Sequence, residues 1–144
     1  MTFESAFGAA NMLALASWAA LIALPRWPAL LALLRTFVIG AFLVAYSALV
    51  MVYFARADGG FGSLDAVQLL FASKPAALAG WLHYLAFDLF VGLWIAERAT
   101  VLGFSRLIQA PVLATTFLFG PVGLLIAYGM SATGRFSRGA EVDA

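Results

Sequence analysis

Cysteine is absent from the 144 residues, histidine occurs once, and charged residues make up only 10% of the chain. The absence of cysteine excludes disulfides, thiol nucleophiles and thiolate metal sites. One histidine leaves too few good metal ligands, so we expect neither a metal site nor a cofactor. The net charge of +1 gives no electrostatic basis for binding nucleic acid, which needs a clustered basic face. Phosphate-binding glycine loops and nucleophile elbows are also missing.

Hydrophobic residues are present in large excess. They form 65% of the chain, and the mean hydropathy is +1.01. A soluble domain would be roughly half apolar and about a quarter charged. The surplus cannot be buried in one small core, so it must face lipid. The composition therefore predicts an all-α, multi-pass integral membrane protein.

Four apolar runs are each long enough to cross hydrocarbon about 30 Å thick, which takes about 20 helical residues. They cover residues 5–24, 30–54, 75–96 and 107–130. We therefore predict a four-transmembrane-helix bundle that forms a single membrane domain over residues 1–144, with a polar tail over 131–144. Lys and Arg divide equally between the two sides of this topology, so the positive-inside rule gives no orientation.

A shorter segment, residues 63–73, lies between the second and third runs. Ser63 suits a helix N-cap and Asp65 suits the first turn. Apolar residues recur at helical spacing with polar ones between them, which predicts a short amphipathic helix at the membrane surface. A structured loop is the alternative.

The third run contains the only histidine, His83, and a carboxylate, Asp88. An Asp at the centre of a membrane helix costs about 2.5–3.5 kcal/mol, so its presence calls for a reason. We predict a functional role for both His83 and Asp88. The alternative is that each makes a structural hydrogen bond to another helix. Five helical residues separate the two side chains by roughly 140°, so they flank one cavity or face different neighbouring helices.

Other polar or helix-breaking residues fall at similar depths when each helix is measured at about 1.5 Å per residue. Tyr46 and the Gly120-Pro121 pair come close to the level of His83, and Pro121 deprives the carbonyl of Phe117 of its helical partner. Thr116 comes close to the level of Asp88. We predict a substrate-binding set drawn from these levels and from the two faces of the third helix: Asn11, Trp81, Tyr84, Glu97, Thr116, Gly120 and Pro121.

Three short blocks are also informative by their order. They are Phe71-Ala72-Ser73, the block from Trp81 through Phe90, and Phe119-Gly120-Pro121-Val122-Gly123. Their order and spacing resemble those of the ABA4-like membrane proteins, a family named for a plant protein needed to make neoxanthin. The resemblance is carried by residues 62–128, and the first two runs are similar in pattern only.

This resemblance implies carotenoid chemistry, namely the isomerisation of the diepoxide violaxanthin to the allene neoxanthin with no redox change. An acid would protonate the epoxide oxygen and a base would take a proton from the polyene. The resemblance implies these roles for His83 and Asp88, without deciding which is the acid.

The expected partners are a carotenoid or another hydrophobic small molecule and membrane lipids, and the sequence leaves open whether the chain forms a homo-oligomer. Because the chain is compact and has no evident plastid-targeting leader, we expect it in a bacterial inner membrane. Two alternatives stay open. One is a protein that binds a carotenoid or lipid, or assembles a complex, without chemistry. The other is a small proton-coupled carrier.

Overall fold

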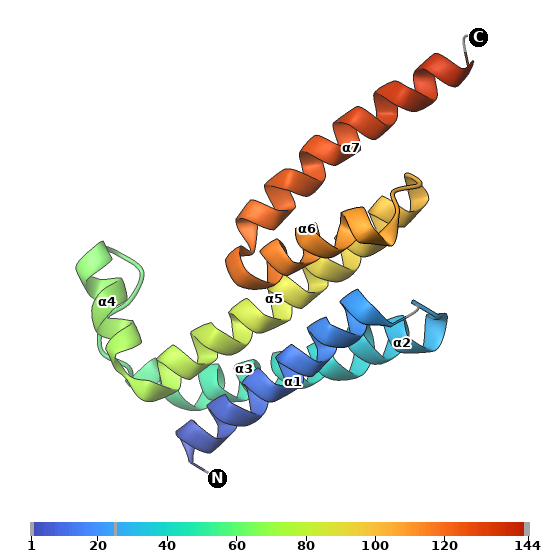
Figure 1. Cartoon of the computed structure of the whole chain (residues 1–144). Coiled ribbons are helices and arrows are strands. Elements are labelled where there is room, and N and C mark those ends of the chain that lie inside the picture. The colour runs from blue at the N-terminus through green and yellow to red at the C-terminus, as the bar shows by residue number, and fades with distance from the viewer. Residues whose placement is uncertain (1, 25, 143–144) are drawn as a thin grey trace. The chain divides into compact units, whose positions relative to one another are not determined.

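The computed structural model describes residues 2–24 and 26–142, with side chains as far as residue 132. Every secondary-structure element in these ranges is a helix (Figure 1). This confirms the all-α prediction for the described part of the chain. The elements are α1 (Phe3–Ala23), α2 (Pro28–Ala32), η1 (Leu33–Val38), α3 (Ile39–Tyr53), η2 (Phe54–Arg56), α4 (Leu64–Ala72), α5 (Lys74–Val101), α6 (Arg106–Phe119) and α7 (Pro121–Val142).

Three helical stretches are long and apolar enough to cross a membrane. They are Phe3–Ala23, Pro28–Arg56 and Lys74–Val101, and they match the first three predicted spans. The second stretch joins α2, η1, α3 and η2 without a break, and η1 is a π-helical segment that contains Arg35. Its start fits the sequence, since Pro28 stands at the first helical position after Trp27.

The third of these helices ends later than predicted. Glu97 and Arg98 do not terminate α5, which continues to Val101. Its end is a Schellman motif: Gly103 has φ +81°, and the Phe104 N–H donates to the carbonyl of Ala99. The two charged residues therefore lie within the last turns of α5.

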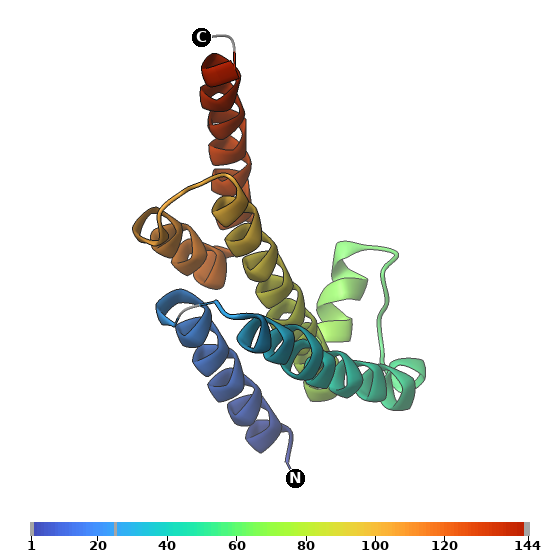
Figure 2. The ribbon, with the colours of Figure 1, turned by 90° about the vertical axis from the view of Figure 1, so that its right-hand side faces the viewer.

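The fourth predicted span, residues 107–130, is not a single helix in the structure. The run forms two shorter helices, α6 and α7, which meet at Gly120 and double back on each other (Figures 1 and 2). Gly120 ends α6 with φ +31°, and Pro121 opens α7 at its first position. The four-span count is therefore not confirmed.

The predicted short helix between the second and third runs is present as α4. Ser63 is its N-cap and accepts a hydrogen bond from the Ala66 N–H at 3.1 Å. The loop before α4 packs on it closely, because a Cβ added to Gly59 would lie 2.6 Å from the Leu70 nitrogen. That α4 lies at a membrane surface stays a prediction.

The chain divides into two compact units, one of residues 1–17 and 26–87 and the other of residues 18–25 and 88–144. In unit 1, α1 runs parallel to α5, because Glu4 pairs with Lys74 and Asn11 pairs with Trp81. The stretch that contains α3 runs antiparallel to both helices.

Unit 2 contains the end of α1, the second half of α5 and the α6–α7 hairpin. Trp18 is buried against Gly92 and lies 5.5 Å from the Phe117 ring. The Arg106 guanidinium donates to the Ile22 carbonyl at 2.8 Å, so it holds the last turn of α1.

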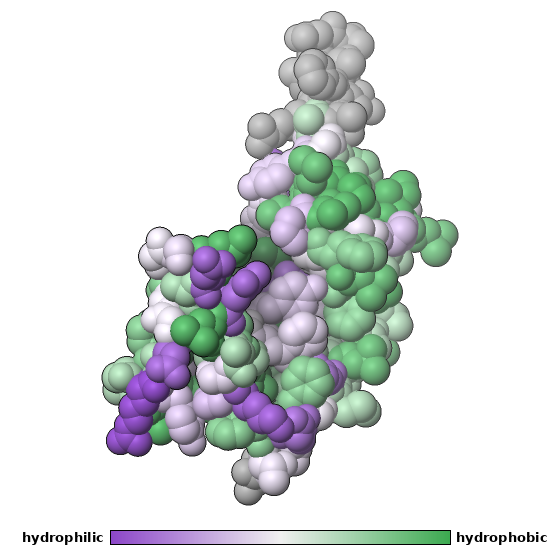
Figure 3. Space-filling model, turned by 90° about the vertical axis from the view of Figure 1, so that its left-hand side faces the viewer, coloured by the Kyte–Doolittle hydropathy of each residue, from purple (hydrophilic) through white to green (hydrophobic). Residues whose placement is uncertain are grey.

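Apolar side chains cover most of the face shown in Figure 3, and hydrophilic ones gather in a few clusters. Many large hydrophobic residues are exposed on the long helices, including Met51 at 85% and Val44 at 71%. A surface of this kind suits contact with lipid acyl chains.

Candidate functional site

A large groove lies in unit 1, and we call it the His83 groove. It has a volume of about 570 Å³ and is formed by α3, η2, the loop before α4, α4 and α5. A cavity of this size falls in the range of about 300–1,000 Å³ that is typical of small-molecule sites. Most of its lining is aliphatic or aromatic, and its polar lining residues are Tyr46, Tyr53, Arg56, Ser73 and His83.

Two helices supply the long walls of the groove at regular spacing. Residues 46, 49, 50 and 53 line it from α3, and residues 76, 79, 80 and 83 line it from α5. Both sets follow the i, i+3, i+4, i+7 pattern of a single helical face. From Tyr46 to Arg56 the chain rises about 15 Å at 1.5 Å per residue, which gives the groove an elongated shape with an arginine at one end.

The segment before α5 forms the remaining wall. The Phe71 ring packs on Gly80 so tightly that a Cβ there would lie 2.6 Å from the Phe71 Cε1 atom. Leu70 is buried and also lines the groove. The groove therefore exists because α4 folds back onto α5 through a glycine contact.

His83 lies at the opposite end of the groove from Arg56 and is held between two rings. The Phe87 ring stacks on the imidazole with centroids 4.4 Å apart and planes 23° apart. The Tyr46 ring lies 5.8 Å away on α3. His83 was selected from the sequence as a catalytic candidate, and the structure gives it an adjoining cavity.

Asn11, Trp81 and Tyr84 lie together in unit 1 but do not line the His83 groove. The Trp81 Nε1–H donates to the Asn11 Oδ1 at 2.7 Å, and the Tyr84 ring stacks on Trp81 at 5.3 Å. Trp81 lines a second hollow of about 310 Å³, beside the Glu4–Lys74 ion pair. Their role in substrate binding stays a prediction.

Asp88 belongs to unit 2 and lies against the turn of the hairpin. A Cβ added to Gly120 would lie 2.6 Å from the Asp88 Oδ1, so the carboxyl group packs directly on this glycine. The Asp88 Oδ2 is shielded from solvent. The sequence estimate put Gly120 and Pro121 at the level of His83. In the structure Gly120 packs on Asp88, five residues further along α5.

Thr116 is fully buried at the crossing of α6 and α7. Its hydroxyl donates to the Val112 carbonyl at 2.8 Å, and its backbone packs against Gly123. The hydroxyl is therefore engaged within its own helix. This contact between a glycine and a backbone allows α6 and α7 to approach closely.

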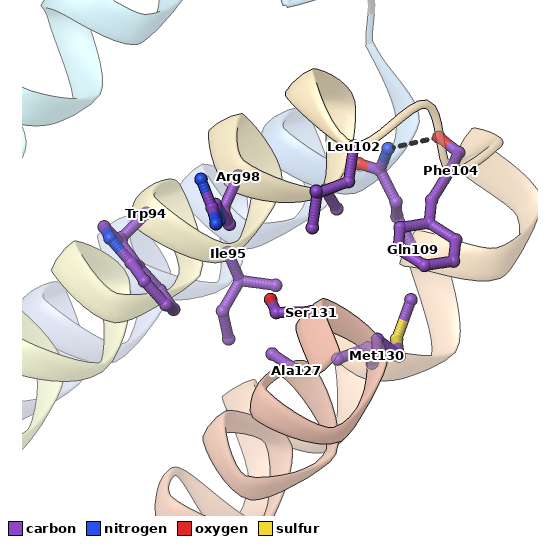
Figure 4. Close-up of a pocket in the computed structure, with 11 residues that line it drawn as sticks. Trp94, Ile95, Arg98, Leu102, Phe104, Gln109, Ala127, Met130 and Ser131 are labelled. Atoms are coloured by element: carbon purple, nitrogen blue, oxygen red, sulfur yellow. Dashed lines mark hydrogen bonds between the residues drawn. The ribbon is translucent and has the colours of Figure 1, made fainter. Parts of the chain in front are cut away.

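Figure 4 shows a small cavity between the end of α5 and the α6–α7 hairpin, with Arg98, Gln109 and Ser131 among its lining residues. Its volume of about 10 Å³ is that of roughly one water molecule. The Gln109 amide donates to the Phe104 carbonyl at 2.7 Å across its rim. Glu97 is half-buried and lines neither this cavity nor the His83 groove. Among the described residues, no three His, Cys, Asp or Glu side chains gather into a metal site.

Comparison with known proteins identifies the family. The family model described as ABA4-like (ABA DEFICIENT 4-like) matches residues 5–126. The chain belongs to the ABA4-like family. The match includes the whole His83 groove, Asp88 and the turn of the hairpin. Searches of curated proteins and of solved structures found no match.

Apart from His83, the groove of this ABA4-like protein has four polar lining residues, and the sequence predicted none of them as a site residue. Tyr46 was placed at the depth of His83 but was not selected, and Tyr53, Arg56 and Ser73 were not considered as site residues. The sequence feature that could have indicated these residues is a shared helical spacing, at positions 46, 49, 50 and 53 and at positions 76, 79, 80 and 83. Tyrosine also recurs within the first set, at positions 46 and 53.

We expect Asp88→Asn to act mainly on stability. The substitution places an NH₂ group where a carboxyl oxygen now packs on Gly120, and a buried polar mismatch costs about 1–3 kcal/mol. Thermal unfolding should shift to lower temperature, while turnover by the folded fraction should change little. Loss of turnover at unchanged stability would instead make Asp88 a catalytic residue.

Proposed function

We propose that this ABA4-like protein binds one end of a carotenoid or related isoprenoid in the His83 groove and isomerises it by intramembrane acid–base catalysis. The observation that carries this proposal is an apolar groove of about 570 Å³ that ends at the only histidine of the chain. A hydrophobic substrate would favour such a lining, and a neutral imidazole is a common proton acceptor near neutral pH.

The length of the groove supports an elongated substrate held by one end. A groove about 15 Å long covers half of a hydrocarbon layer about 30 Å thick. The remainder of a long polyene would lie in the lipid beyond the groove.

The proposed reaction converts an epoxide into an allene without a change in composition. A base removes the proton from the alkene carbon next to the epoxide, and the electron pair of that C–H bond forms the second cumulated double bond. The adjacent C–O bond breaks, and the epoxide oxygen receives a proton and becomes a hydroxyl. One proton leaves and one enters, so neither an oxidant nor a reductant is needed.

The direct test uses the purified protein in lipid nanodiscs with violaxanthin as the probe. We expect an isomer of unchanged mass that elutes separately from violaxanthin, because one of its two epoxides has become an allenic alcohol. Chromatography with mass detection measures both changes. Violaxanthin that neither binds nor changes would contradict the proposal.

A second candidate function is binding without chemistry, which the location of Asp88 outside the groove favours. Under this reading the protein stores or presents a carotenoid. The same experiment separates the two functions: pigment recovered unchanged in stoichiometric amount, with no isomer after prolonged incubation, would support binding alone.

A further inference from the structure

We infer that Tyr46 is the acid partner of His83, so that the catalytic pair lies across the groove and not along α5. This inference rests on the proposed function. Tyr46 comes from α3 and His83 from α5, and both line the groove within unit 1. Their ring centroids are 5.8 Å apart with planes at 54°, so a substrate end beside one ring is also beside the other.

Both polar groups are available to a ligand. Within the described residues, neither the His83 imidazole nor the Tyr46 hydroxyl forms a hydrogen bond to protein. The Trp81 indole, on the same helix as His83, is by contrast engaged, because it donates to the Asn11 Oδ1 at 2.7 Å. Tyr46 is half-buried and His83 is exposed where it lines the groove, so both polar groups are accessible to a substrate bound there.

The chemistry balances with these two groups alone. The neutral imidazole takes the proton from the alkene carbon, and the phenol gives its proton to the epoxide oxygen as the C–O bond breaks. The site is then left with an imidazolium and a phenolate. Transfer of one proton from His83 to Tyr46, directly or through one water, restores both groups for the next turnover.

The alternative partner, Asp88, is placed less favourably. It lies in the other unit, its carboxyl group packs on Gly120, and it does not line the groove. Phe87 adds a positioning role on the His83 side, because its ring stacks on the imidazole one helical turn away. Phe87 covers one face of the imidazole, and His83 still lines the groove together with Tyr46.

The test is Tyr46→Phe, which removes only the hydroxyl and keeps the ring contact with His83. Using violaxanthin in nanodiscs, we expect kcat to fall about 100-fold while KM stays within about twofold, as for a group that acts only in the transition state. The solvent deuterium isotope effect on kcat should change as well, which a purely structural role would not produce. Tyr128→Phe is the matched control, because Tyr128 packs on Trp94 within unit 2 and does not line the groove.

The outcomes separate this inference from the proposed function. If Tyr46→Phe turns over normally while His83→Phe is inactive, the function stands and the assignment of Tyr46 is wrong. If both variants match the wild type, neither residue takes part in the chemistry, and catalysis in the His83 groove is ruled out. If the native protein itself does not convert violaxanthin, the proposed function fails independently of the assignment of Tyr46. A rise in KM of about 100-fold for Tyr46→Phe, with kcat unchanged, would also overturn the assignment. Tyr46 would then bind the substrate without taking part in the chemistry.

Discussion

His83→Phe is expected to lower the rate of isomerisation by at least about 100-fold, the usual contribution of a general acid or base. Phenylalanine keeps an aromatic ring between Phe87 and Tyr46, at 4.4 and 5.8 Å in the native protein, but has no nitrogen to accept a proton. The groove should therefore keep its shape and still bind pigment. Initial rates in nanodiscs, together with pigment retained after washing, measure the two properties separately.

Gln68→Ala is the control for this variant, because Gln68 is exposed on α4 and does not line the groove. Its turnover should equal that of the native chain. Full activity in His83→Phe would remove the histidine from the mechanism, and loss of pigment binding along with activity would leave His83 as a binding residue.

Gly123→Val is expected to lower the free energy of unfolding by about 3 kcal/mol, the upper part of the range for overpacking. A Cβ at position 123 would lie 2.5 Å from both the Cα and the backbone nitrogen of Thr116. These are backbone atoms, so no change of rotamer relieves the contact, and α6 and α7 must separate. Unfolding in mixed micelles, followed by circular dichroism, measures the loss.

Gly129→Val provides the matched control on the same helix. A Cβ there meets nothing within 4 Å, and valine brings the same intrinsic helix cost at both positions. Gly129→Val should therefore stay close to the native stability. Equal stability of the two variants would show that α6 and α7 do not pack through Gly123, and would favour one continuous helix over residues 107–130.

Hydropathy was sufficient to predict the first three spans, because each is one uninterrupted apolar helix. It failed for the fourth, since a uniformly apolar run contains no sign of where the chain reverses. A Gly120-Pro121 pair fits either a kinked helix or a turn between two helices. The packing of Thr116 on Gly123 and of Asp88 on Gly120 is compatible only with the turn, and these contacts join residues that the sequence pattern does not relate.

The candidate site was predictable to a similar extent. His83 could be selected because an ionisable side chain within an apolar run is rare and costly. Helical rise also placed Tyr46 at the level of His83, and the structure brings their rings together. The groove itself could not be predicted, because it depends on α4 folding back so that Phe71 packs on Gly80. Without the groove, the sequence could not show that Tyr46 lines a cavity together with His83 and that Asp88 does not.

The central claim is that the His83 groove holds one end of the substrate. Photolabelling with a carotenoid that carries a photoreactive end group, followed by peptide mass spectrometry, tests it most directly. We expect the label on residues 46–57 of α3, η2 and the adjoining loop, and on residues 70–83 of α4 and α5. Unlabelled violaxanthin should reduce this labelling by competing for the groove. Label confined to residues 106–132, or spread over the exposed apolar surface without competition, would contradict it.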